Sequence, residues 1–118
     1  MLLKEISEIL KAEVLVGEDS LNVEICAAEA SDLMSDVLSF TKPGVILLTG
    51  LANSHTIRTA ELADLAAIIF VRGKKPNRET LNLAKAKRIP LLSTYHHMFE
   101  ACGLLAKKGL KGTNETSV

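Results

Sequence analysis

A run of seven residues at positions 65–71, apolar throughout, constrains the fold of this chain more than any other segment. A strand that is buried on one face alternates apolar and polar residues, so an unbroken apolar run indicates burial on both faces. Residues 45–48 and the shorter segment 89–92 have the same character, and the segments between these runs have helical spacing. Strands that alternate with helices in this way predict a parallel sheet covered by helices.

The segments before these runs extend the alternation toward the N-terminus. The apolar residues of segment 3–10 fall on one side of a helix, and residues 14–16 and 23–28 are predicted strands. Residues 33–39 form a predicted helix, with Ser31 as its N-cap. The first third of the chain therefore adds two helices and two strands to the predicted fold.

The helices after the middle strand are marked by the residues at which they begin. Asn53 or Ser54 would cap the first of them, and the loop that ends at Asn77 would cap the second. A last helix is expected after Thr94. The fold class that follows is a single α/β domain, with a mainly parallel sheet and helices on both of its faces.

Length, charge and composition narrow the classes of function. The 118 residues form one domain, which we place at residues 1–110, followed by a polar, disordered tail at residues 111–118. Lys and Arg number 14, as do Asp and Glu, and 3% of the residues are aromatic, so the chain lacks the basic surface and stacking platforms of nucleic-acid-binding proteins. No membrane span or signal peptide is recognisable, so we expect a cytoplasmic protein without membrane partners. Cys26 and Cys102 are expected to be reduced thiols of the core.

Three predicted loops leave the carboxyl ends of the strands and should meet at one edge of the sheet, where open parallel sheets bind ligands. Each loop leads into a helix N-terminus, whose free N–H groups favour anions. The polar side chains of these loops are Asn53, Ser54, His55, Arg72, Lys74, Lys75, Thr94 and His96. They form a candidate site for a small anionic ligand, although caps and solvated lysines of this kind could also serve the fold alone.

Asp32 and Asp36 form a second candidate surface, because helical spacing places them one turn apart on a polar face. Such a pair fits a solvated face, a face that binds a protein partner, or a divalent-cation site. A zinc site at His96 would have to recruit His55 and Cys102 from distant parts of the sequence. We therefore predict no metal site, no cofactor and no catalytic residues.

The ordered series of segments resembles the DRTGG domain, and above all the small stand-alone proteins built from that domain alone. Residues 14–17, 31–37, 64–69, 73–76 and 89–94 carry the resemblance, which extends from Leu3 to about Leu110. This domain is similar to the N-terminal region of HPr kinase/phosphorylase. Where it is fused to phosphotransacetylases or to CBS-containing pyrophosphatases, it looks like a regulatory or dimerising module. The resemblance implies the same α/β fold and a non-catalytic role.

The chain departs from the family pattern at two points. Many fused members carry Gly-Asp-Arg at the helix start after the middle strand, where this chain has Ala52-Asn53-Ser54, so a role of that Asp and Arg is not carried over. Many members also have two glycines where this chain has Arg72-Gly73. A kinase of the HPr kinase type needs the phosphate loop GxxxxGK[ST], which the sequence lacks, so we predict no kinase activity.

We therefore predict a non-catalytic regulatory or interaction module. It would sense a small anionic metabolite or nucleotide, or dock on a metabolic enzyme. A homodimer is expected because 47% of the residues are hydrophobic and so small a chain leaves apolar area to cover. The alternative is a small-molecule metabolic enzyme that uses the pocket at the C-terminal ends of the strands.

Overall fold

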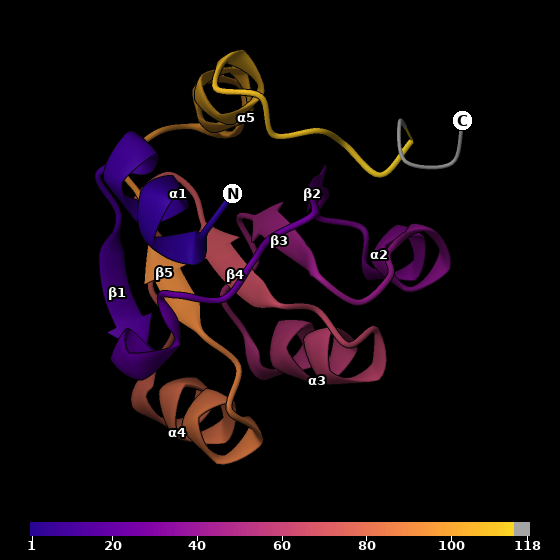
Figure 1. Cartoon of the computed structure of the whole chain (residues 1–118). Coiled ribbons are helices and arrows are strands. Elements are labelled where there is room, and N and C mark those ends of the chain that lie inside the picture. The colour runs from indigo at the N-terminus through magenta and orange to yellow at the C-terminus, as the bar shows by residue number, and fades with distance from the viewer. Residues whose placement is uncertain (115–118) are drawn as a thin grey trace.

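A computed structural model describes residues 1–114, which form one five-stranded sheet between two layers of helices (Figure 1). The strands are β1 (Glu13–Val16), β2 (Ala27–Ala30), β3 (Val45–Thr49), β4 (Ala67–Phe70) and β5 (Leu91–Ser93). The helices are α1 (Leu3–Leu10), α2 (Met34–Phe40), α3 (Ser54–Leu62), α4 (Arg78–Lys87) and α5 (Met98–Lys107), and a short 3-10 helix, η1 (Glu18–Ser20), follows β1. In the described part of the chain, no helix has both the length and the apolar character needed to cross a membrane.

The sheet has the strand order β1-β5-β4-β3-β2, and its last four strands are parallel. Only β1, at one edge, runs antiparallel to its neighbour. α1 and α5 cover one face of the sheet, and α2, α3 and α4 cover the other (Figure 1). This arrangement confirms the predicted fold class, a single α/β domain with a mainly parallel sheet and helices on both faces.

The three apolar runs are the buried strands β3, β4 and β5, in which every residue is buried. Alternate side chains of a strand point to opposite faces of the sheet. In β3, Val45 and Leu47 belong to the core beside α2 and α3, whereas Ile46 and Leu48 belong to the core beneath α1 and α5. Because both faces are covered, each residue of the run is apolar, and each large side chain contributes about 1.5–3 kcal/mol by its burial.

The N-terminal third differs from the prediction in two boundaries. The strand expected at residues 23–28 begins only at Ala27, because the N–H of Ile25 donates to the Met1 carbonyl (2.7 Å) and so holds this segment against the N-terminus. Ser31 is not the N-cap of α2, which begins after Leu33. The Ser31 hydroxyl instead accepts a hydrogen bond from the Leu33 N–H (3.0 Å) and forms a local turn. Such turns compete with capping, since the same side-chain oxygen serves both.

Two expectations about the rest of the chain also need correction. Cys26 is exposed rather than part of the core, and Cys102 is half-buried, so that burial raises the pKa of its thiol. The predicted tail begins as an ordered segment: the Lys111 carbonyl accepts a hydrogen bond from the Ala28 N–H (2.9 Å), and Gly112 pairs with Ala28. The last part of that predicted tail, residues 115–118, lies outside the described residues.

Candidate functional site

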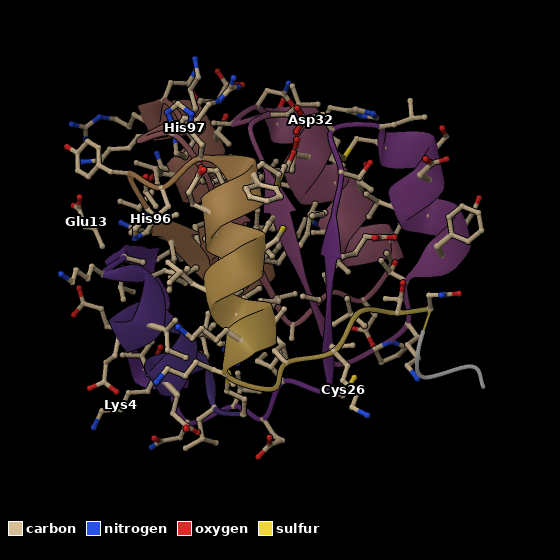
Figure 2. The ribbon with its side chains drawn as sticks, turned by 90° about the horizontal axis from the view of Figure 1, so that it is seen from above. Lys4, Glu13, Cys26, Asp32, His96 and His97 are labelled. Carbon is tan, nitrogen blue, oxygen red and sulfur yellow. The ribbon has the colours of Figure 1, made fainter. Side chains whose placement is uncertain are left out.

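The carboxyl ends of β2, β3, β4 and β5 lie at one edge of the sheet because these strands are parallel. The loops that follow them contain the candidate residues. Figure 2 shows Asp32 and His97 at this edge, whereas Cys26 lies at the opposite edge of the molecule. The topology therefore assembles the loops as the sequence predicts.

Asp32 lies in the loop between β2 and α2, and it binds the end of β3. Its Oδ1 accepts hydrogen bonds from the Thr49 hydroxyl (2.7 Å) and from the Gly50 backbone N–H (2.8 Å). The Gly50 hydrogen bond, followed by that of Thr49 and then by the charge of Arg72, holds the pKa of the Asp32 carboxyl below its ordinary value. The expectation that Asp32 and Asp36 share one helix face is wrong, because Asp32 precedes α2 and its carboxylate binds the β3 loop.

Arg72 follows β4 in an uncommon backbone conformation. Its φ is 59°, in the left-handed region that residues other than glycine rarely adopt. The other non-glycine residues with positive φ in the described chain are Lys11, Asp64 and Arg88, which follow helices, where a left-handed residue is an ordinary ending. Only Arg72 among these four has this conformation at the end of a strand.

Two backbone hydrogen bonds hold this conformation. The N–H of Arg72 donates to the His96 carbonyl (2.9 Å), and the N–H of Gly73 donates to the Thr94 carbonyl (2.8 Å). The loop after β4 is thereby joined to the loop after β5. The surrounding structure thus fixes the direction in which the Arg72 side chain leaves the backbone.

The guanidinium of Arg72 lies over Gly50 and near Asp32. A β carbon built on Gly50 would come within 2.7 Å of a terminal nitrogen of Arg72 and 3.7 Å of the Asp32 Oδ1. Gly50 therefore leaves the space that the guanidinium occupies. Asp32, Thr49, Gly50 and Arg72 form what we call the strand-end cluster, in which an exposed cation and an exposed carboxylate lie close together. Such a pair can bind a ligand that carries both negative charge and hydrogen-bond donors.

Some of the predicted ligand-binding residues already serve the fold. Thr94 is buried, and its hydroxyl donates to the Leu10 carbonyl (2.8 Å), which ties the β5 loop to α1. The Asn53 Oδ1 caps α3 by accepting from the Thr56 N–H (3.1 Å). Figure 2 places His96 on the α1 side, away from Asp32. The sequence predicted that these side chains would share one ligand site. In the structure Thr94 and Asn53 make hydrogen bonds within the fold, and His96 lies away from Asp32.

Other predicted residues remain accessible at this edge. His55 is exposed and Ser54 is half-buried, and both lie in the first turn of α3. Lys74 is exposed, while its carbonyl accepts a hydrogen bond from the Ser93 hydroxyl (2.8 Å). Lys75 forms a salt bridge with Glu13 (2.7 Å), and this hydrogen bond raises the pKa of the Lys75 ammonium. Lys75 is therefore already paired with a carboxylate, whereas Lys74 can offer its charge to a ligand that binds at Arg72.

The contributions of Thr49, Gly50 and Tyr95 were not predicted from the sequence. Thr49 and Gly50 belong to the predicted loop after residues 45–48 but were not candidate residues, although a hydroxyl followed by glycine at a strand end is a signal for a close contact. Tyr95 is 84% exposed, and its ring lies against Gly73, where a built β carbon would come within 3.0 Å of it. An aromatic ring therefore lies against the loop after β4. Among the described residues, no group of three or more His, Cys, Asp or Glu side chains could hold a metal ion.

Comparisons with known proteins agree with this architecture. The family model of the DRTGG domain matches residues 5–107. No curated protein matches the sequence. Among solved structures, the chain is similar to the CBS and DRTGG domains of the regulatory region of Clostridium perfringens pyrophosphatase, complexed with its activator, diadenosine tetraphosphate. The match has 22% sequence identity and a TM-score of 0.73, and it covers 87% of this chain but 45% of that one. At this level of identity the likeness shows the fold.

Proposed function

Because the chain belongs to the DRTGG-domain family, we propose that it is a homodimeric regulatory module that binds a small anionic metabolite or nucleotide at the strand-end cluster. The observation that carries this proposal is the placement of Arg72. Its side chain leaves a left-handed backbone that two hydrogen bonds hold, and its exposed guanidinium lies over Gly50. Backbone strain of this kind costs on the order of 1–3 kcal/mol and is concentrated at ligand clamps and switches.

The charges around Arg72 favour an anion that is small and can approach two loops. Lys74 is exposed two residues away, and the first turn of α3 begins four residues after Gly50. Guanidinium groups bind carboxylates and phosphates through paired, charge-assisted hydrogen bonds. Asp32 limits the attraction, since its carboxylate lies beside the same guanidinium. The ligand must therefore also donate a hydrogen bond to Asp32 or displace Arg72 from it.

A nucleotide is the ligand class that fits best, because Tyr95 adds an exposed ring against Gly73, in the loop that carries these cations. Bases stack on aromatic side chains while their phosphates pair with nearby cations. The similar Clostridium perfringens regulatory region was solved with diadenosine tetraphosphate, so this dinucleotide is the first probe. ATP, AMP and inorganic phosphate separate the contribution of the base from that of the phosphate.

Thermal unfolding with each probe tests the proposal. A ligand that binds only the folded chain stabilises it by about 2.7 kcal/mol at a hundred times its Kd, which is a shift of several degrees in Tm. Arg72→Ala should remove most of this shift and leave the Tm without ligand nearly unchanged, since an exposed loop side chain adds little packing. Arg88→Ala is the matched control, because Arg88 is exposed and has a φ of 56° at the end of α4.

The possible results separate the candidate functions. Binding that is lost in Arg72→Ala and kept in Arg88→Ala supports the module. Binding that survives Arg72→Ala combined with Lys74→Ala contradicts the site. Turnover of a bound probe would favour the alternative, a small-molecule metabolic enzyme at the same edge. If no probe binds, docking on a metabolic enzyme becomes the better candidate, with the exposed Asp36 of α2 as the first residue to test.

A further inference from the structure

The outward face of α5 is apolar and uncovered. Phe99 is 84% exposed, and a β carbon built on Gly103 would meet no atom within 4 Å. Ala106 is exposed as well. Residues at positions 99, 103 and 106 are spaced by four and three, so they lie on one side of the helix. Figure 2 shows α5 across the middle of its sheet face, with α1 on one side and, on the other, β2, which the segment after α5 crosses and pairs with at Ala28.

An apolar cleft of about 210 Å³ adjoins α5 on the β2 side. The sheet and the helix line two of its sides with mostly apolar side chains, and the segment after α5 lines the third; the lining residues are Ala28, Ala30, Leu48, Cys102, Leu105, Ala106, Leu110, Lys111 and Gly112. Ala28 and Ala30 of β2 form the floor of the cleft, next to the buried Leu48 of β3. The same helix thus carries a protruding aromatic side chain and forms one wall of a mostly apolar cleft. A surface of this kind can be complementary to itself.

Two opposite charges on α5 could also pair between two copies of the chain. Glu100 and Lys107 are exposed seven residues apart, which places them on one side of α5 near its opposite ends. The three salt bridges found among the described residues involve other side chains. If a second α5 crossed antiparallel at Gly103, positions equally distant from that glycine would face each other. Glu100 would then lie within one residue of Lys107 of the partner subunit, and Phe99 would reach the level of the cleft.

We propose that α5 is the homodimer surface, with two copies packed antiparallel about a two-fold axis at Gly103. Phe99 of each copy enters the cleft of the other, and Glu100 faces Lys107 of the partner subunit. Two-fold interfaces use the same patch on both copies, as this geometry does. A glycine at the crossing lets the two helices approach closely. This inference rests on the proposed homodimer and names the surface that forms it.

Sedimentation equilibrium of the full chain tests the surface. Phe99→Glu should weaken dimerisation at least about thirtyfold, because a central aromatic anchor is typical of a hot spot. Leu62→Glu is the matched control, since Leu62 is 76% exposed on α3, on the other face of the sheet. It should leave the Kd of the dimer unchanged. Circular dichroism checks that both variants are folded, as expected for exposed positions.

Charge reversal tests the antiparallel arrangement. Glu100→Lys alone, or Lys107→Glu alone, should weaken the dimer about tenfold, because each creates two like-charge contacts across the axis. The double variant restores opposite charges and should recover most of the wild-type affinity. A double variant that is as weak as the single ones overturns the antiparallel pairing.

The failures of the two proposals are distinguishable. A wild-type chain that remains monomeric at all concentrations overturns the homodimer, and the surface with it. A wild-type dimer that Phe99→Glu leaves intact overturns the α5 surface alone and keeps the homodimer. Weakening by Leu62→Glu rather than by Phe99→Glu moves the interface to the α3 face.

Discussion

Asp32 connects three loops that are distant in the sequence. It lies after β2, accepts hydrogen bonds from Thr49 and Gly50 after β3, and approaches the guanidinium of Arg72 after β4. An exposed carboxylate with these partners is held in one position, and this fixes the charge that any ligand meets. The side chain therefore limits which anions can bind beside Arg72.

Replacing Asp32 should make stability less dependent on pH in acid. Asp32→Asn should lower the free energy of unfolding at pH 7 by about 1 kcal/mol, because the amide oxygen accepts the same hydrogen bonds without the charge that strengthens them. The folded-state pKa of Asp32 lies below the unfolded value of about 3.9, so its contribution is present above that value and is lost as the pH falls through the folded pKa. Urea unfolding between pH 7 and pH 3 measures this difference.

The control for that measurement is Asp36→Asn, which removes an exposed carboxylate from α2. The difference between wild type and Asp32→Asn should shrink as the pH falls below about 4. A difference that stays constant down to pH 3 would contradict the assigned role of the Gly50 and Thr49 hydrogen bonds.

At the scale of the elements, α3 and α4 begin in the same way. The Asn53 Oδ1 accepts from the Thr56 N–H (3.1 Å), and the Asn77 Oδ1 accepts from the Thr80 N–H (2.9 Å). Asn77→Ala should therefore cost about 1 kcal/mol of stability, whereas Asn77→Asp should retain most of it. Chemical denaturation with an unchanged m-value measures the loss. Equal stability of Asn77→Ala and wild type would show that the cap is dispensable.

The elements also show what the sequence can predict. Burial on both faces makes β4 apolar throughout, and it makes β3 and β5 apolar up to their last residues, Thr49 and Ser93. Asn77 likewise indicates the start of α4 from the sequence alone. The segment at residues 23–28 was predicted poorly because the Met1 carbonyl, distant in the sequence, binds the Ile25 N–H. The Asp32 contact was missed for the same reason, since its partners Thr49 and Gly50 belong to another strand. Within the local sequence, the helical spacing between Asp32 and Asp36 indicated a shared helix face, but Asp32 precedes α2 and binds the loop after β3.

At the scale of the whole molecule, the chain should lack ATPase and protein kinase activity. The sequence contains no phosphate loop of the pattern GxxxxGK[ST], and Gly73-Lys74-Lys75 has one glycine and no following hydroxyl. Phosphate release from Mg²⁺-ATP by the purified chain measures this. Release beyond one equivalent that disappears in Lys74→Ala would contradict the expectation.

The most direct test of the central proposal is a titration of the ¹⁵N-labelled chain with diadenosine tetraphosphate, followed by amide NMR. The glycines serve as reporters, because Gly50 and Gly73 adjoin Arg72, whereas Gly17 lies after β1, next to Pro90. We predict saturable shifts of the Gly50, Arg72 and Gly73 amides, with Gly17 unchanged and the response lost in Arg72→Ala. Saturation without shifts at Gly50 and Gly73, or no saturable shift with any nucleotide or phosphate, would contradict a regulatory site at the strand-end cluster.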